Sequence, residues 1–428
     1  MFKFESGKDF AKYLDDEDPL KSFRKRFSIP EGCIYLDGNS LGLMPKDSEK
    51  TLSRVLEEWK NLGISGWLEA KQPWFYFAEE IGRMASELVG AEPDEVVAAG
   101  STTVNIHSLI STFFQPYKGK NKILADELNF PSDIYALKSH LKLRGLNPAK
   151  HLILIPGKKN NTLSEKTIMG KMTDDIALIF LSSVLYQSGQ LLDIPSLTKK
   201  AGEKGIFIGF DCSHSVGVVP HKFDEWGVDF ALWCSYKYLN SGPGSSAFLY
   251  INKKHFEREP LITGWFGYKK DKQFEMLLDF DHHRGAGGWQ ISTPGILSLS
   301  AIEGSLKVFK EAGISNIREK SKKLTSYFIY LVDKYLSKSP YNFSVGSPRD
   351  PDKRGGHIAL ERKNETRRIC ETLKKRRIIT DFRKPNIIRF APVALYNTYL
   401  EVWKVIQALK EIIEQKEYEK FNEEVNPQ

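Results

Sequence analysis

The sequence of 428 residues carries a net charge of +8 and is 41% hydrophobic and 27% charged. This length is too great for one simple core, so two domains, or one large domain with a smaller one, are expected. The composition excludes a disordered or fibrous chain. No apolar run reaches the roughly 18 residues of a membrane span. Residues 1–10 lack the basic and then apolar layout that is typical of a signal peptide.

Short apolar runs alternate with helical patterns between residues 94 and 235. The runs are aliphatic or aromatic and nearly uninterrupted, which is typical of strands buried on both faces. The predicted strands are 94–101, 121–128, 151–157, 175–184, 205–213 and 228–235, and the helices predicted between them are 102–115, 131–143 and 194–205. This alternation predicts an α/β fold with a mostly parallel sheet, which binds its ligands at the carboxyl ends of the strands.

A different pattern begins after about residue 295. Two long amphipathic helices are predicted at 293–313 and 314–336. Short predicted strands at 357–361 and 386–391 follow, and a charged helix at 398–421 comes last. This combination predicts a smaller α+β domain. Because no low-complexity linker separates the two parts, we expect them to pack together.

The densest positive charge lies in residues 363–377, KNETRRICETLKKRR. A basic stripe of this kind is compatible with nucleic-acid binding. Ile369, Cys370 and Leu373 stand at helical spacing, however, which favours a helix with one buried face and one solvated basic face. We therefore expect no nucleic-acid partner, and only a diffuse positive field that attracts anionic ligands.

The four cysteines form no CxxC pair and no metal-ligand cluster. Cys212 and Cys234 lie in or beside apolar runs, where free thiols behave as small hydrophobic side chains. This pattern predicts a reduced, cytoplasmic protein without a metal ion.

Lys237 stands between two apolar runs, in WCSYKYLNSGPGSS, just after the predicted strand 228–235. A lysine there either extends its ammonium group to water or acts as a nucleophile whose pKa is lowered by burial. Asp211, at the end of the preceding strand, favours the nucleophile, because a buried carboxylate needs a cationic partner such as a protonated pyridine nitrogen.

Two further features fit a phosphorylated cofactor. The segment AAGSTTVN places Thr102 and Thr103 where a predicted helix follows a strand, and free backbone N–H groups at such a helix start bind anions. Phe130, in NFPSD, is placed to stack on an aromatic ring, although most phenylalanines are core residues. Each signal alone is weak, but together with Lys237 and Asp211 they predict pyridoxal 5'-phosphate on the α/β domain.

The chain resembles the kynureninases, in the class V group of pyridoxal-phosphate enzymes of aminotransferase fold type I. The resemblance extends from residue 34 to residue 403, and its most specific segments are GNSLGL, FPSD, GFDCSHSVG, WGVDFALWCSYKYLNSGPG, GWFGY and IRFAPVALYN. It implies a large domain, residues 50–295, with a mostly parallel seven-stranded sheet covered by helices. A smaller α+β domain would comprise residues 1–49 and 296–428.

The resemblance also implies which residues form the site. Lys237 would bind the cofactor aldehyde covalently, and Tyr236 would contact the phosphate and assist proton transfer. The other residues implied to bind the cofactor are Thr102, Thr103, Phe130, Asp133, Ser182, Asp211 and His214, with Trp265 and Thr293 reaching the phosphate from a neighbouring subunit. Those implied to bind the substrate are Arg389, as the clamp of the α-carboxylate, and Trp67, Asn39 and Ser40.

The implied reaction is hydrolysis of the Cβ–Cγ bond of L-kynurenine, giving anthranilate and L-alanine, in tryptophan catabolism or the supply of a NAD precursor. Cleavage of 3-hydroxykynurenine to 3-hydroxyanthranilate stays open, because Trp67 and Thr293 stand at positions near the aryl ring that bias this choice. The resemblance further implies a homodimer with active sites at the interface.

Two other functions compete with this one. A cysteine desulfurase or selenocysteine lyase of the same fold needs a thiol of lowered pKa on a mobile loop, and none of the four cysteines occupies an obvious loop of that kind. A non-catalytic protein that kept the fold is less favoured, because Lys237, Asp211 and Arg389 are all retained.

Overall fold

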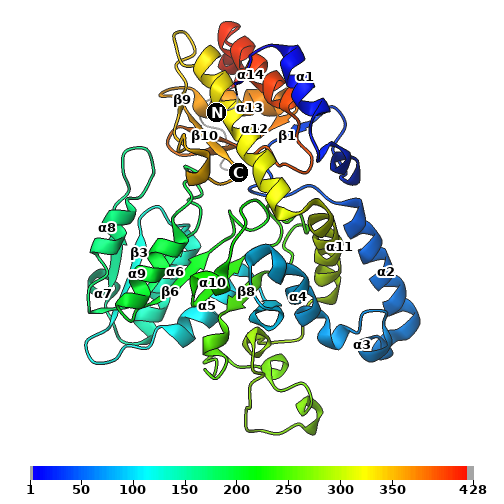
Figure 1. The fold of residues 1–428 in the computed structure, drawn as a ribbon, viewed down its shortest axis with the longest axis vertical. Helices are drawn as coiled ribbons and strands as arrows, with labels where there is room; N and C mark the ends of the chain where they lie inside the picture. The colour runs from blue at the N-terminus through cyan, green and yellow to red at the C-terminus, as the bar shows by residue number, and fades with distance from the viewer. Residues whose placement is uncertain (1–2, 422–428) are drawn as a thin grey trace.

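A seven-stranded sheet forms the centre of the computed structural model, which describes residues 3–421 (Figure 1). The strand order is β2 (Val96–Ala98), β8 (Phe248–Ile251), β7 (Phe230–Trp233), β6 (Phe207–Asp211), β5 (Ile176–Ser182), β3 (Lys122–Asp126) and β4 (Leu152–Ile155). Strand β8 is antiparallel to both of its neighbours, and the remaining pairs are parallel. The predicted α/β fold with a mostly parallel sheet is confirmed.

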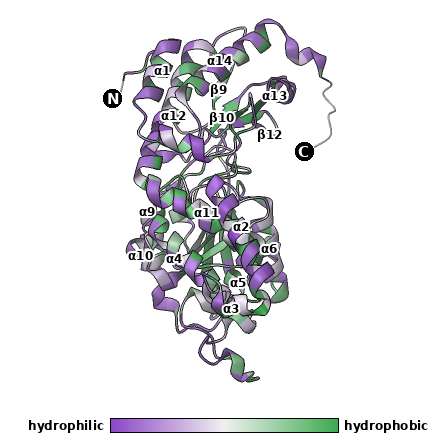
Figure 2. Cartoon of the chain, turned by 90° about the vertical axis from the view of Figure 1, so that its right-hand side faces the viewer, coloured by the Kyte–Doolittle hydropathy of each residue, from purple (hydrophilic) through white to green (hydrophobic). Residues whose placement is uncertain are grey.

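Helices surround this sheet. The larger ones are α4 (Phe77–Val89), α5 (Thr102–Phe113), α6 (Pro131–Leu143) and α9 (Ile194–Glu203), and the short ones are α3 (Gly66–Glu69), α7 (Pro148–His151), α8 (Glu165–Gly170) and α10 (Phe223–Trp226). Every residue of β5 is buried, as an uninterrupted apolar run predicts for a strand covered on both faces. The strands accordingly appear green at the centre of Figure 2, whereas hydrophilic residues lie mostly on the outer helices.

A smaller α+β unit lies above the sheet in Figure 1. Its four-stranded antiparallel sheet has the order β12 (Asp381–Arg383), β13 (Ile387–Phe390), β10 (Ile358–Glu361) and β9 (Ser344–Val345). Its helices are α1 (Lys8–Asp16), α12 (Ile314–Tyr335), α13 (Thr366–Lys375) and α14 (Tyr399–Glu414). The N-terminal segment joins this unit through the parallel pair β1 (Ile34–Tyr35) and β11 (Ile378–Ile379).

Local sequence signals account for the ends of these helices. Helix α14 begins with a capping box, in which Thr398 and Glu401 each accept a hydrogen bond from the backbone of the other. It ends at Glu414, earlier than the predicted 421, and Lys416 just beyond it has a left-handed backbone with φ of 51°. No helix in residues 3–421 is long and apolar enough to cross a membrane.

Two clusters of buried hydrophobic side chains underlie the two units. The first contains the seven-stranded sheet and also the buried face of α11 (Ile296–Ala312), including Leu299 and Phe309. The second contains the buried faces of α12 and α14 and the small sheet. The division into 50–295 and the rest stays a prediction, and the packing of α11 on the first cluster favours a boundary near Gly313.

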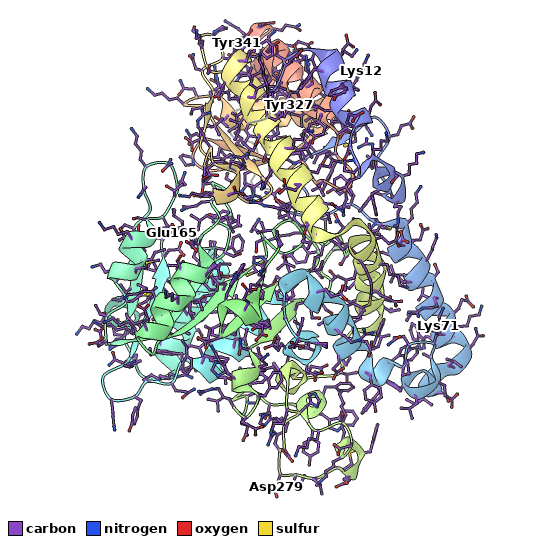
Figure 3. The ribbon with its side chains drawn as sticks, in the orientation of Figure 1. Lys12, Lys71, Glu165, Asp279, Tyr327 and Tyr341 are labelled. Carbon is purple, nitrogen blue, oxygen red and sulfur yellow. The ribbon has the colours of Figure 1, made fainter. Side chains whose placement is uncertain are left out.

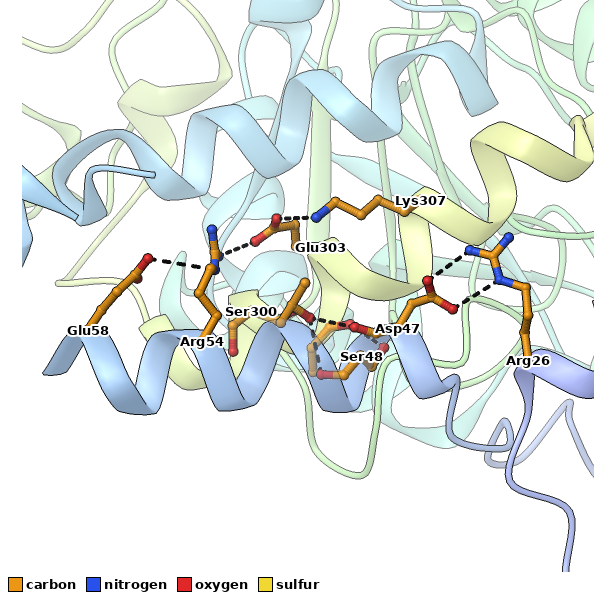
Figure 4. Close-up of polar contacts among 10 residues, drawn as sticks. Arg26, Asp47, Ser48, Arg54, Glu58, Ser300, Glu303 and Lys307 are labelled. Atoms are coloured by element: carbon orange, nitrogen blue, oxygen red, sulfur yellow. Dashed lines mark hydrogen bonds and ion pairs between the residues drawn. The ribbon is translucent and has the colours of Figure 1, made fainter. Parts of the chain in front are cut away.

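Helix α2 (Lys46–Leu62) lies along α11 in close contact (Figure 4). The Ser48 hydroxyl donates to the carbonyl of Ala301 at 2.7 Å, and Arg54 pairs with Glu303 at 2.5 Å. A Cβ atom at Gly304 would stand 2.4 Å from the Cα of Ser48, far inside van der Waals contact. The absence of a side chain at Gly304 is therefore what permits the two helices to approach so closely.

We predict that Gly304→Ala lowers the free energy of unfolding by about 1–3 kcal/mol, because the added methyl group forces the α2 backbone away from α11. Urea unfolding followed by circular dichroism measures this change. Gly202→Ala in α9 is the matched control, since a Cβ there would meet no atom within 4 Å. That variant should gain up to about 1 kcal/mol from helix propensity, and an equal gain at Gly304 would contradict the close approach.

Candidate active site

A cavity of about 190 Å³ lies at the carboxyl ends of β5, β6 and β7, the edge where an α/β sheet binds its ligand. Its lining residues are Thr102, Thr103, Phe130, Ser132, Ser182, Val184, Tyr186, Asp211, Ser213, His214, Tyr236 and Lys237. Ser132, Val184, Tyr186 and Ser213 are additions to the predicted residues. The others are predicted cofactor-binding residues, and the fold brings them together from separate segments.

Lys237 lies in the turn that follows β7. Its Nζ is 3.1 Å from Nε2 of His214 and 5.9 Å from the centre of the Phe130 ring. Burial lowers the pKa of His214 well below its usual range, and the charge of Lys237 lowers it further, so the imidazole facing the amine is neutral. The lysine thus stands between a neutral imidazole and an aromatic face.

The GNSLGL segment holds the lysine turn in place. The amide of Gly42 donates to the carbonyl of Tyr236 at 2.7 Å, and a Cβ at Gly42 would stand 2.4 Å from the carbonyl oxygen of Lys237. Only glycine fits so close to another backbone. The predicted substrate residues Asn39 and Ser40 belong to this same segment, so the lysine and the substrate-side loop are fixed relative to each other.

Two carboxyl groups meet at the floor of the site. Asp211 ends β6 and its Oδ1 accepts a hydrogen bond from the amide of Ser213 at 2.7 Å. Asp133 lies fully buried in the first turn of α6, and its Oδ2 has no hydrogen-bond partner among the described residues. Burial raises the pKa of Asp133 well above its usual range, and the charge of Asp211 raises it further. A cationic ring N–H is the kind of group that this pair would stabilise.

The start of α5 offers an anion site at the same cavity. Thr102 and Thr103 are its first two residues, and the preceding Ser101 makes no side-chain hydrogen bond to the first turn. The first-turn amides and the helix dipole therefore face the cavity without a side-chain cap, which suits a phosphate group. Ser182 is held nearby by its hydrogen bond to Oδ1 of Asn129 at 2.8 Å.

Arg389 lies beyond Tyr186, in the small sheet. It stands opposite Asp381 in the register of β12 and β13, and its Nε donates to Oδ1 of that aspartate at 2.7 Å. Its Nη1 donates to the carbonyl of Tyr186 at 2.8 Å, and its Nη2 donates to the hydroxyl of Ser40 at 3.1 Å. This guanidinium, 1% exposed, therefore joins the N-terminal segment, the large sheet and the small sheet.

Three predicted residues lie away from this cavity within the chain. Trp265 is 45% exposed, and its indole N–H donates to the carbonyl of Gln273 at 3.3 Å. Thr293 lines a separate hollow of about 280 Å³ beside Gly100. Trp67 lines an apolar hollow of about 550 Å³ beside α2. The predicted roles of Trp265 and Thr293 require a second subunit, and the role of Trp67 stays a prediction.

Residues that the sequence reasoning missed are Tyr186, Asp37, Asp381 and Arg383, which surround Arg389. Asp381 and Arg383, two residues apart in the short strand DFR, were a visible signal, because residues at that spacing lie on one face of a strand. Their meeting with Arg389 depends on the antiparallel register of β12 and β13, which the sequence does not display. Among residues 3–421, no three His, Cys, Asp or Glu side chains are arranged to hold a metal ion.

The fold matches solved enzyme structures. A cysteine desulfurase from Thermococcus onnurineus has a TM-score of 0.77 at 18% identity, covering 97% of this chain and 100% of that structure. A variant of the enzyme C-DES, with glycine covalently linked to its PLP cofactor, has a TM-score of 0.77 at 15% identity, covering 90% and 98%. The fold therefore defines the class: an α/β protein with the architecture of these solved enzymes.

Sequence similarity defines the family. Residues 317–409 match the model of the kynureninase C-terminal domain. The kynureninase of Geobacillus thermodenitrificans is 54% identical over 97% of this chain and 96% of its own length, and that of Bacillus thuringiensis is 52% identical over 98% of each. The kynureninase of Shouchella clausii is 51% identical over 97% of each. The chain belongs to the kynureninase family, as the resemblance predicted.

We predict that Asp133→Asn stabilises the cofactor-free protein more at pH 8 than at pH 5. Folding raises the pKa of Asp133. Between the pKa of Asp133 in the unfolded chain and its higher pKa in the folded chain, the folded chain keeps a proton that the unfolded chain releases. Over that range the free energy of unfolding falls by up to about 1.4 kcal/mol per pH unit. Asparagine removes this loss. Urea unfolding at both pH values measures the difference, with the exposed Asp271→Asn as control; a gain independent of pH would contradict the raised pKa.

Proposed function

We propose that this chain hydrolyses L-kynurenine to anthranilate and L-alanine with pyridoxal 5'-phosphate as cofactor. The observation that carries the proposal is the placement of Lys237 beside His214 and Phe130, in a cavity that Asp211 also lines, in a chain of the kynureninase family. The residues fit the cofactor at three points: the amine of Lys237 for its aldehyde, the carboxyl group of Asp211 for its ring nitrogen, and the uncapped start of α5 for its phosphate.

Bound pyridoxal phosphate supplies an aldehyde for covalent attachment and a protonated ring that accepts electrons from the reacting carbon. Asp211, held by the amide of Ser213, keeps the ring nitrogen protonated. Lys237 accepts the proton from the substrate Cα and returns it later. His214 lies 3.1 Å from the amine and is neutral, so it does not take up a proton in place of Lys237 in the neutral pH range.

Tyr236 is the proposed donor of the proton that completes alanine after the Cβ–Cγ bond breaks. Its side chain lines the cavity, and burial raises the pKa of its phenol, which keeps the hydroxyl protonated and able to donate. Phe130 would cover one face of the ring, and Thr102 and Thr103 would hold the phosphate. Arg389, with Asn39 and Ser40 beside it, would bind the α-carboxylate of the substrate.

The desulfurase alternative is not favoured, because that chemistry requires an exposed thiol of lowered pKa. All four cysteines are free and buried. Burial raises the pKa of each thiol, to about 12 for Cys212 and for Cys370. The free thiols also support the proposed cytoplasmic location, where cysteines stay reduced.

We further propose a homodimer in which Trp265 and Thr293 complete the neighbouring subunit's site. The segment that carries Asp279 projects from the body of the chain (Figure 3), and its apolar side chains Phe274, Met276 and Leu278 are exposed. Exposed apolar side chains on a projecting segment are typical of a surface that a second subunit covers. The choice between kynurenine and 3-hydroxykynurenine depends on Trp67 and Thr293 in this arrangement, and comparing kcat/KM for the two substrates decides it.

We predict that Lys237→Ala abolishes turnover and the visible absorbance of the covalently bound cofactor. Absorbance spectra and the fluorescence of released anthranilate measure the two effects. Lys166→Ala, which removes an exposed lysine of α8, should match the wild type in both. Normal turnover by Lys237→Ala would refute the assignment of the nucleophile.

We predict that mixing two inactive variants, Lys237→Ala and Trp265→Ala, restores activity. In a hybrid dimer, one of the two sites has both the intact lysine and the intact tryptophan, and the other site has neither. Random exchange makes about half of the dimers hybrids, so activity should rise to about one quarter of the wild-type value. Each variant alone, treated in the same way, is the control. Full activity of Trp265→Ala, or failure of the mixture to regain activity although hybrids form, would contradict a shared site.

A further inference from the structure

Arg389 has no free donor in this structure. A guanidinium carries five N–H groups. Four of those of Arg389 face both carboxylate oxygens of Asp381, the Ser40 hydroxyl and the Tyr186 carbonyl. The fifth faces the side-chain oxygen of Asn39, 3.3 Å from Nη1, in the amide orientation that lets the Asn39 nitrogen donate to Asp37. A substrate carboxylate can therefore reach Arg389 only by replacing one of these partners. Among the contacts that need no reorientation of the Asn39 amide, the longest is that to the Ser40 hydroxyl, at 3.1 Å.

Arg383 is a second guanidinium beside this cluster, and it is largely without partners. It lies two residues after Asp381 on β12, so the two side chains are on the same face of the strand. Its Nη2 forms an ion pair with Oδ2 of Asp381 at 2.6 Å, and its Nε is buried with no hydrogen-bond partner among the described residues. Its side chain is 35% exposed, which leaves room for a ligand.

Arg383 is also close to the cofactor side of the site. Its ion-pair partner Asp381 also holds Arg389, whose Nη1 donates to the carbonyl of Tyr186 at 2.8 Å. Tyr186 lines the cavity that contains Lys237. Arg383 therefore belongs to the cluster of side chains that lies next to this cavity.

Two acidic side chains accompany the two arginines. Arg383 and Arg389 face two carboxyl groups, Asp37 and Asp381. Burial and the charge of Asp381 raise the pKa of Asp37 to about 6, so Asp37 is still mostly ionised at neutral pH. An incoming carboxylate therefore depends on the unpaired N–H groups of Arg383 rather than on an excess of positive charge.

We propose that Arg383, together with Arg389, binds the α-carboxylate of the substrate. The carboxylate lies between the two guanidinium groups and takes the place of the Ser40 hydroxyl on Arg389. This inference rests on the proposed function, because it takes the substrate to be an α-amino acid. Arg389, held by Asp381 and the Tyr186 carbonyl, provides a fixed orientation, and Arg383 provides the unused N–H groups that offset the lost Ser40 bond.

Arg383→Gln tests the proposal in the holoenzyme. We expect KM for L-kynurenine to rise about 10- to 100-fold, the loss of a charge-assisted hydrogen bond, with a smaller change in kcat and an unchanged cofactor spectrum. Arg383→Lys keeps the charge without the planar fork and should lie between. The matched control is Lys384→Gln, which removes the same charge from an exposed neighbour and should leave KM within twofold of the wild type.

A second measurement isolates the carboxylate. L-Alanine and ethylamine differ only in that group, and each changes the absorbance of the bound cofactor when it reacts there. The wild type should bind L-alanine far more tightly than ethylamine, and Arg383→Gln should lose most of that preference. An unchanged preference, or equal weakening of both ligands, overturns the proposal. Loss of preference in a protein that does not cleave kynurenine would leave Arg383 as a carboxylate-binding residue and refute only the proposed reaction.

Discussion

The burial of the Arg389 guanidinium is the interaction on which the arrangement of the site depends. A charge removed from water is costly unless partners replace all of its solvation. Its partners come from Ser40 near the N-terminus, from Tyr186 after β5 and from Asp381 in the small sheet. Three segments that are distant in sequence must therefore meet before this arginine can be buried, and that meeting fixes the small unit against the large sheet.

The same N-terminal segment carries this constraint to the nucleophile. Gly42 packs directly on the backbone of the lysine turn, and Ser40, two residues earlier, contacts Arg389. A shift of the small unit would therefore move both the Lys237 amine and the Arg389 guanidinium. A single short segment thus helps to fix the distance between these two groups.

Charge is controlled within the cavity by burial rather than by solvent. Asp133 and Asp211 stand together, and burial raises the pKa of Asp133 well above its usual range. His214 is kept neutral beside Lys237 for the same reason. The two arginines lie beyond Tyr186, and each forms an ion pair with Asp381.

The sequence by itself indicated six of the seven strands of the large sheet and the helices α5, α6, α9, α11, α12 and α14, because continuous apolar runs and helical periodicity are local signals. It did not indicate β8, α2 or α4. It also indicated Arg389, through the resemblance of IRFAPVALYN. It did not indicate Asp381, Arg383 or Tyr186 as neighbours of that arginine, since their contacts depend on strand register and on how one unit packs against the other. Only the tertiary structure decided that Arg389 is saturated and Arg383 is not, because the number of acceptors around a buried guanidinium is a property of residues far apart in the chain.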